Sequence, residues 1–219
     1  MNKLIISALA ALAIAGCSGV QETTVVESRN LMSPDGNLEM TFTLTSDGTP
    51  QYALNYKGEP VILPSGMGFD IRGVLKAQKI DYNADGTISK SDREPVYSLH
   101  DGFTLQNAET SSFDETWTPV WGEEDAIRNN YNELAVNLVQ TSTDKRLTIR
   151  FRLFDDGLGF RYEFPAQSNL NYFVIKEELT EFALTGDHTA WWIPGDYDTQ
   201  EYNYTQSSLS EIATKPPRP

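Results

Sequence analysis

Hydrophobic and polar residues alternate along most of the chain from about Val25 onward. Between Leu38 and Leu44 every second side chain is large and apolar, and the residues between them are Glu or Thr. The same alternation recurs over residues 134–138, 147–153 and 160–164. Successive side chains of a β-strand point to opposite faces of a sheet, so this pattern predicts half-buried antiparallel strands.

Short turns separate the predicted strands. Asp155-Asp156-Gly157 lies between two of them and predicts a hairpin, because Gly adopts positive φ angles easily. Further turn sequences occur at 33–36, 47–48 and 57–58, and a helical turn or two is expected only at 208–213. Many short antiparallel strands with closely spaced turns predict an all-β fold, a large antiparallel β-sandwich.

The first residues have the pattern of an export signal. A positive start ending at Lys3 precedes the apolar run Leu4–Ala15, which is too short to span a bilayer. The run ends in Ile-Ala-Gly-Cys-Ser, which resembles the bacterial lipobox and makes Cys17 the lipid-carrying first residue of the mature chain. We predict a signal peptide at 1–16, a tether at 17–27, and an exported lipoprotein, periplasmic or anchored to the outer membrane of a Gram-negative bacterium. The alternative is an ordinary secretory signal with an incidental Cys.

Composition narrows the possible functions. Hydrophobic residues make up 39% of the chain, enough for a core, and the formal net charge is -14. Nucleic acids and anionic lipid surfaces repel a net anion, so we exclude them as partners. One Cys and two His, His100 and His188, argue against a disulfide framework, a Cys/His zinc site and a His-dependent catalytic triad. Carboxylates and neutral polar groups must therefore perform any chemistry.

Residues 81–92 have the spacing of a calcium-binding loop. Oxygen ligands at loop positions 1, 3, 5, 7, 9 and 12 surround a hard cation in such loops, with Gly at position 6 for the sharp bend. The segment resembles an EF-hand or dockerin loop, and Asp at position 12 favours the dockerin type. With Gly86 at the bend, the predicted Ca²⁺ ligands are Asp81, Asn83, Asp85, the Thr87 carbonyl, Ser89 and Asp92. We predict an insertion at 79–94 that the ion ties down, and the alternative is a solvated turn.

Three blocks in the second half of the chain are more specific. The first is DETWTPVWGE at 114–123, followed by IRNNYNE at 127–133. The others are FRLFDDGLGFRY at 151–162 and AWWIPGDYDTQEYNY at 190–204. Together they closely resemble the N-terminal domain of glycoside hydrolase family 97, which comprises α-glucosidases and α-galactosidases.

The resemblance runs in order from about Ser28 to Ile212. It implies a β-super-sandwich related to galactose mutarotase-like folds over 28–212, followed in the family by a catalytic (β/α)8 barrel. The catalytic carboxylates of the family belong to this barrel. We therefore expect none in this chain, place them beyond Pro219, and assign 213–219 as a Pro-rich tail.

The resemblance also implies a role for Glu201. In the family the sandwich packs on the barrel and supplies one Glu to a calcium ion at the active site, and Glu201 matches it by position. A carboxylate among Tyr side chains and near Trp191 and Trp192 combines a metal ligand with sugar-stacking rings, although an ordinary surface Glu is the alternative. Trp117 and Trp121 are expected in the core or in packing between domains rather than as sugar platforms.

Arginine side chains on the predicted strands are expected to form ion pairs. Arginines on a strand surface pair with carboxylates more often than they bind substrate. We expect this of Arg128, Arg150, Arg152 and Arg161. His188 follows an Asp in a predicted turn and is expected to be solvated.

The leading functional hypothesis is a carbohydrate-binding scaffold domain of a calcium-dependent α-glycosidase that degrades oligosaccharides. We expect it to be inactive alone, because hydrolysis needs two carboxyl groups about 5 to 9 Å apart across the scissile bond, and no such pair is identifiable. Its expected partners are oligosaccharide, calcium and a barrel domain, if one is encoded separately. The alternatives are a stand-alone lipid-anchored carbohydrate-binding lipoprotein and a structural lipoprotein that binds only calcium.

Overall fold

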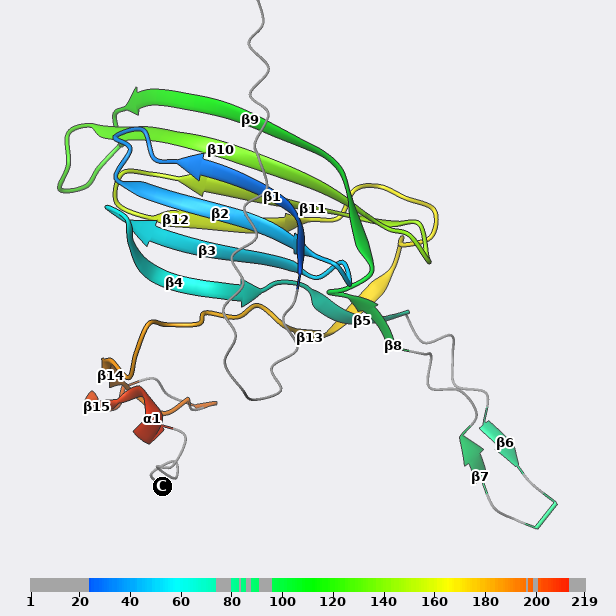
Figure 1. Ribbon diagram of the computed structural model, residues 1–219. Helices are drawn as coiled ribbons and strands as arrows, with labels where there is room; N and C mark the ends of the chain where they lie inside the picture. Colours follow the sequence, from blue (N-terminus) through cyan, green and yellow to red (C-terminus); the bar gives the residue numbers. More distant parts are fainter. Residues whose placement is uncertain are drawn as a thin grey trace, which may run out of the picture.

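The protein folds as a β-sandwich with smaller sheets at one end. The structure, a computed structural model, describes residues 24–73, 80–82, 84–85, 88–90, 96–195, 197–198 and 201–212. Two four-stranded antiparallel sheets lie face to face (Figure 1). The predicted all-β class and antiparallel architecture are confirmed.

The first sheet has the order β1-β2-β3-β4 and is made of consecutive hairpins. Its strands are β1 (Val25–Met32), β2 (Leu38–Thr45), β3 (Pro50–Tyr56) and β4 (Glu59–Gly66). The three turns predicted at 33–36, 47–48 and 57–58 join them. Lys57 and Gly58 both have positive φ, at 51° and 84°, as a tight two-residue hairpin turn requires.

The second sheet has the order β12-β11-β10-β9. Its strands are β9 (Phe103–Trp117), β10 (Ile127–Gln140), β11 (Lys145–Leu153) and β12 (Leu158–Glu163). The predicted hairpin joins β11 to β12, where the Phe154 N–H donates a hydrogen bond of 2.8 Å to the Gly157 carbonyl. Gly157 does not have a positive φ, so the turn is confirmed but the conformational reason given for its Gly is wrong.

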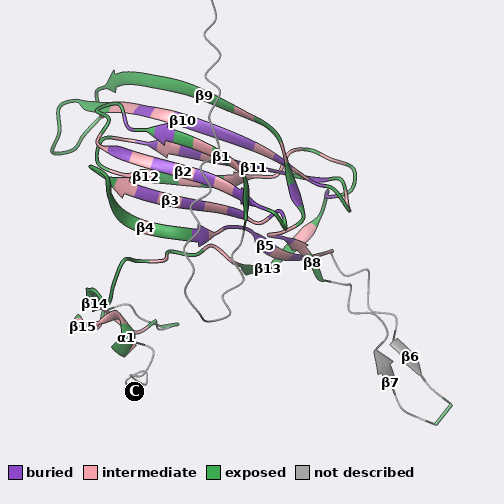
Figure 2. Cartoon of the chain, in the orientation of Figure 1, coloured by how far each residue is buried: buried purple, intermediate pink, exposed green. Residues whose placement is uncertain are grey.

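The core lies between the two sheets (Figure 2). The inward side chains of β2, including Met40 and Phe42, are fully buried against those of β10 and β11, including Val136 and Phe151. Ring centroids of Phe42 and Phe151 lie 6.1 Å apart. Each large apolar side chain buried in this way contributes roughly 1.5 to 3 kcal/mol relative to an exposed one, so this contact drives formation of the sandwich.

Three smaller sheets complete the described structure. A three-stranded sheet has the order β13-β5-β8, and two pairs are formed by β6 with β7 and by β14 with β15. The bounds are β5 (Phe69–Gly73), β6 (Ile80–Tyr82), β7 (Ile88–Lys90), β8 (Val96–Leu99), β13 (Phe173–Glu178), β14 (Thr189–Trp192) and β15 (Thr205–Ser208). The short helix α1 (Leu209–Ile212) falls where a helical turn was predicted. The described residues contain no helix with the length and hydropathy of a membrane span.

A connecting strap, residues 179–185, runs along the edge strand β4 toward the C-terminal elements. The Leu63 N–H donates to the Ala183 carbonyl at 2.8 Å, and the Tyr52 hydroxyl donates to the Glu181 carbonyl at 2.9 Å. Burial raises the pKa of Tyr52 to about 12, which keeps this hydroxyl protonated and able to donate. The strap thus covers the edge of the first sheet and positions the module that follows it.

Candidate functional site

The C-terminal module, residues 186–212, carries the predicted sugar-stacking residues. In the β14–β15 pair Trp191 lies opposite Gln206 and Trp192 lies opposite Thr205. Adjacent strand residues point to opposite faces, so the two rings cannot act together on one side. Trp191 is 63% exposed. Trp192 is half-buried, and its Nε1–H donates to the Ser207 hydroxyl at 3.0 Å. Of these two rings, Trp191 is the more exposed.

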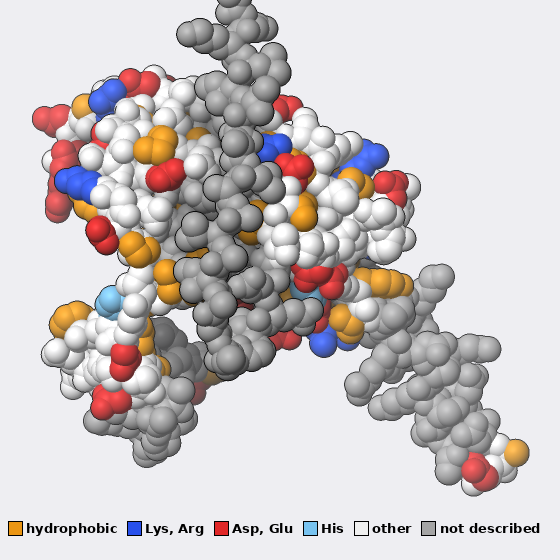
Figure 3. All heavy atoms as spheres, viewed as in Figure 1, with side chains coloured by type: hydrophobic (Ala, Val, Ile, Leu, Met, Phe, Trp, Pro, Cys, Tyr) orange, Lys and Arg blue, Asp and Glu red, His pale blue; other side chains and the backbone are white. Residues whose placement is uncertain are grey.

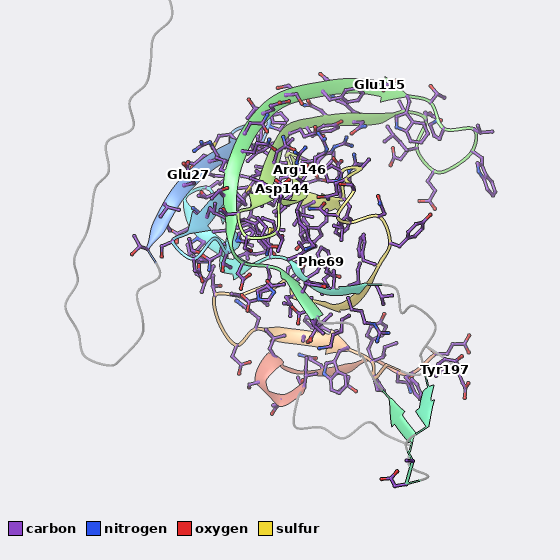
Figure 4. All side chains as sticks on the ribbon, turned by 90° about the vertical axis from the view of Figure 1, so that its right-hand side faces the viewer. Glu27, Phe69, Glu115, Asp144, Arg146 and Tyr197 are labelled. Atoms are coloured by element: carbon purple, nitrogen blue, oxygen red, sulfur yellow. The ribbon has the colours of Figure 1, made fainter. Side chains whose placement is uncertain are left out.

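Glu201, the predicted ligand of the active-site calcium ion, lies in the same module. It is exposed and precedes β15 in the chain. Exposed aromatic side chains on this module include Tyr204 and Tyr197. Figure 4 shows Tyr197 on the same side of the molecule as Glu115 of β9 and opposite Glu27 of β1. Within the described residues the structure brings together no cluster of three or more carboxylate, imidazole or thiol groups that could hold a metal ion.

The predicted calcium loop corresponds to the hairpin of β6 and β7. The first and ninth positions of the loop, Asp81 and Ser89, pair in the backbone register of this hairpin. Asp85 is exposed in the turn between the strands. Asn83, Thr87 and Asp92 lie outside the described residues, as does the lipidation residue Cys17. Calcium binding by this segment stays a prediction.

At the tip of the β9–β10 hairpin, the prediction that Trp117 and Trp121 lie in the core is wrong. Trp117 is 47% exposed and Trp121 is 90% exposed, and Val120 between them is also exposed. Neither Trp belongs to the core, because Trp117 lies on the outer face of the sheet, on the same side of β9 as Phe113, and Trp121 lies in the loop between β9 and β10. The other half of the expectation, packing against another domain, stays open for both residues.

The four predicted arginine pairs are all present. Arg128 makes two hydrogen bonds to Asp114, at 2.8 and 2.7 Å. The other pairs lie on the outer face of the second sheet, the face turned away from β1–β4. They join Arg150 to Glu133 and Glu163, Arg152 to Glu133, and Arg161 to Glu163, with distances of 2.5 to 2.8 Å. His188 is exposed in a turn, as predicted.

This outer network sets the ionisation of its carboxyl groups. Hydrogen bonds, first from Arg150 and then from Arg161, lower the pKa of Glu163 to about 2 against partial desolvation. Desolvation is the largest influence on Glu133 and favours a raised pKa, but Arg152 and Arg150 together outweigh it and lower that pKa. Both carboxylates are therefore fully charged at neutral pH.

A row of aromatic rings continues the outer face toward the hairpin tip. The rings of Phe113 and Tyr131 are stacked with centroids 5.3 Å apart, and the guanidinium carbon of Arg152 lies 4.3 Å from the centroid of Tyr131. Phe154 packs on Tyr131 from the next hairpin, also at 5.3 Å. This row was not predicted from the sequence. Its signal on β9 is that Phe113 and Trp117, four residues apart, fall on the same side of an extended strand.

A family comparison identifies the class to which this sandwich belongs. The family model for the glycosyl-hydrolase 97 N-terminal domain matches residues 31–218. The chain therefore belongs to glycoside hydrolase family 97, as an N-terminal domain of that family, and the predicted resemblance is confirmed.

Individual relatives are several times longer than this chain. A retaining alpha-galactosidase of Bacteroides thetaiotaomicron is 24% identical over 194 residues, which cover 83% of this chain and 24% of that protein. A glycoside hydrolase family 97 enzyme from Pseudoalteromonas sp. strain K8, solved in complex with acarbose, is 30% identical with a TM-score of 0.68. That match covers 84% of this chain and 25% of the enzyme. The chain thus spans about a quarter of the length of these relatives.

Two further solved structures agree. The same Pseudoalteromonas enzyme in complex with panose gives a TM-score of 0.67 at 30% identity, covering 83% of this chain and 24% of that one. A beta-arabinopyranosidase matches with a TM-score of 0.60 at 18% identity, over 81% of this chain and 26% of that one, which supports the fold alone.

Proposed function

We propose that this chain is the N-terminal scaffold of a calcium-dependent α-glycosidase that degrades oligosaccharides outside the cytoplasm. The family match over 31–218 carries the proposal. Two observations support it. The chain corresponds to only a quarter of enzymes that were solved with panose and acarbose. The exposed aromatic side chains of the β9–β10 hairpin and the C-terminal module provide surface for a partner.

In this proposal Glu201 is a ligand of the active-site calcium ion. The strap along β4 connects its module to the sandwich, and Glu201 is exposed on that module. Calcium in an active site supplies positive charge that stabilises negative charge developing on oxygen. Trp191, exposed on the same module, is the residue we assign to sugar contact.

The calcium requirement is tested with a graft. The matching quarter of the Pseudoalteromonas enzyme is replaced by residues 28–212, and hydrolysis of panose is followed against free calcium concentration. Loss of one carboxylate ligand in Glu201→Gln is expected to raise the calcium concentration for half-maximal activity at least about tenfold, by analogy with losses at metal sites. Glu211→Gln, an exposed Glu of the same module, is the matched control. An unchanged calcium profile in Glu201→Gln contradicts the assignment.

Bond cleavage itself is assigned to the catalytic domain. The purified chain without its signal peptide should not hydrolyse p-nitrophenyl α-glucoside or α-galactoside, with or without calcium. Because an acid and a base or nucleophile must flank the scissile bond, the scaffold alone lacks the required pair in this proposal. Turnover that disappears in Glu201→Gln would show that the chain is an enzyme by itself.

A second calcium ion is proposed for the β6–β7 hairpin. The ligands are those of the predicted loop, with Asp81 and Ser89 adjacent across the strands. Isothermal titration with CaCl₂ should give one site that Asp81→Asn weakens at least tenfold. Asp144→Asn, at a distant turn between β10 and β11, should leave it unchanged. Identical titrations of the unchanged chain and the two variants would show that the loop is an ordinary turn that does not bind calcium.

The exposed ring of Trp191 also favours a second candidate, a lipid-anchored carbohydrate-binding lipoprotein. In this case the isolated chain should bind maltooligosaccharide or a galactoside in calorimetry, and Trp191→Ala should abolish binding while Trp121→Ala does not. Anchoring through Cys17 is tested by fractionation. The native protein should sediment with membranes, and Cys17→Ser should not.

A further inference from the structure

The outer face of the second sheet contains a pocket lined by guanidinium groups. The pocket has a volume of about 180 Å³ and is lined by Arg150, Arg152, Phe154, Gly159, Phe160 and Arg161. The strand register explains the cluster, because Arg150 pairs with Arg161 and Arg152 pairs with Gly159 across β11 and β12. Glycine opposite Arg152 leaves the space in which the pocket forms.

The hydrogen-bond donors of the pocket are only partly used. Arg150 donates from Nε, Nη1 and Nη2 to Glu133 and Glu163. Arg152 donates only from Nε, so its Nη1 and Nη2 groups have no acceptor within the described part of the chain. Two guanidinium N–H donors side by side match the two oxygens of a carboxylate. The open donors of Arg152 therefore define what the pocket can bind.

The local charge of the pocket also favours a carboxylate as its ligand. Three guanidinium groups share two carboxylates, which leaves one positive charge in excess, whereas the whole chain carries a net charge of -14. The guanidinium group of Arg152 also packs over the ring of Tyr131, so less side-chain entropy is lost when it binds. A fixed, unbalanced cation at the surface of an anionic protein attracts an anion.

The size and surroundings of the pocket favour a side chain over a free ligand. Small-molecule sites usually measure roughly 300 to 1,000 Å³, well above the volume found here. The adjacent exposed rings, from Phe113 to Trp117, together with Arg, are the residue types enriched in protein interfaces.

We propose that this pocket receives the carboxylate of an Asp or Glu side chain from the polypeptide that packs on the outer face. The inference rests on the proposed function, in which that polypeptide is the catalytic part that makes up the remaining three quarters of the relatives. The ion pair fixes the rotation of the scaffold on its partner, and the aromatic row supplies apolar contact.

The pocket can be tested on the chain alone, independently of any catalytic part. The probe is N-acetyl-glutamate amide, and N-acetyl-glutamine amide is its uncharged equivalent. Binding is followed by NMR through the Nε–H signals of the arginine side chains at constant ionic strength. We expect saturable shifts of the Arg152 signal with a dissociation constant in the millimolar range for the glutamate probe and none for the glutamine probe.

Matched variants make the result specific. Arg152→Met keeps the aliphatic stem over Tyr131, leaves Glu133 paired with Arg150, and should weaken binding at least tenfold, read from the Arg161 signal. Arg29→Met, which removes an exposed arginine paired with Glu27 on β1, should change nothing. Equal shifts with both probes, or undiminished binding in Arg152→Met, would overturn the proposal.

A third probe separates a protein side chain from an acidic sugar. Galacturonate carries the same carboxylate on a pyranose ring that is large for this pocket, and we expect it to bind no more tightly than the glutamate probe. Tenfold tighter binding of galacturonate would overturn the side-chain assignment. Failure of the graft experiment with binding of the glutamate probe intact would contradict the proposed function and leave the pocket established.

Discussion

The two faces of the β9–β12 sheet differ sharply although they are built from the same strands. On the inner face of β11, Leu147, Ile149, Phe151 and Leu153 are fully buried against the first sheet. On the outer face, Arg150 and Arg152 alternate with them and bind Glu133 and Glu163. One face holds the domain together through apolar burial, and the other retains charge, donors and exposed rings.

Charge on the outer face is arranged in a hydrogen-bonded network rather than merely solvated. Figure 3 shows Asp and Glu side chains spread over the visible surface of the protein, with fewer Lys and Arg. Against this acidic surface the outer face concentrates three arginines in one network. Ion pairs that are partly screened by solvent contribute only modestly to stability, so the excess of arginine over carboxylate in this network is better explained by recognition than by folding.

The largest effect is expected on the inner face. Phe151→Ala removes a ring that is 0% exposed and contacts Phe42 and Tyr52. The lost burial and the remaining cavity should lower the free energy of unfolding by about 3 to 5 kcal/mol. Urea denaturation followed by intrinsic fluorescence measures this change, and a loss below about 1 kcal/mol would mean that the sandwich is not held by this core.

A smaller effect is expected at the most buried carboxylate of the outer face. Glu133→Gln removes the common partner of Arg150 and Arg152, and we expect a loss of about 1 to 2 kcal/mol in the same urea experiment, because the pairs are partly screened by solvent. Asp114→Asn breaks the exposed pair with Arg128 and is the matched control, with no measurable change expected. Equal losses in the two variants would remove the distinction between network and isolated pair.

The stability that the outer-face network contributes should also depend on pH, unlike that of the apolar core. The pKa of Glu163 is lowered from 4.5 to about 2 in the folded protein, so the unfolded chain takes up the proton at higher pH. The stabilisation from Glu163 is therefore present above about pH 5 and is lost as the pH falls toward 2. The stability difference between native protein and Glu163→Gln should shrink over this window. A difference that stays constant from pH 6 to pH 3 would show that the carboxylate has an ordinary pKa.

The smallest effect on stability is expected at the hairpin tip. Trp121→Ser removes a ring that is 90% exposed, so the melting temperature of the isolated chain should not change measurably. In the graft with a catalytic part, the same substitution should lower the melting temperature, because the ring would then be buried in the interface. Destabilisation of the isolated chain would mean that Trp121 packs within this domain after all.

Sequence alone predicted the strands whose alternation is strict. The apolar positions from Leu38 to Leu44 and from Leu147 to Leu153 face a second sheet throughout, so their pattern and their burial coincide. The turns with Gly36, Gly48 and Gly58 were also predicted, and all three have positive φ. These features depend on neighbours along the chain, which a sequence displays directly.

The parts that were missed depend on contacts between distant residues. The apolar character of a residue does not say which face of a strand is covered or where the strand ends, and for that reason Trp117 and Trp121 were not distinguished from core residues. Pairing with carboxylates was expected of Arg150 and Arg161, but their meeting in one pocket follows from the register of β11 with β12. That Trp191 and Trp192 point to opposite sides follows from strand alternation and was overlooked.

The unequal length of the strands has one more consequence. β9 contains 15 residues, whereas β2 contains 8. At about 3.3 Å per residue these span about 50 Å and 26 Å, so β2 cannot cover the ribbon of β9 and β10 along its whole length. The length of this ribbon sets how far its tip reaches. Lengthening or shortening both strands by two residues would preserve which side chains face outward and would move the tip by about 7 Å.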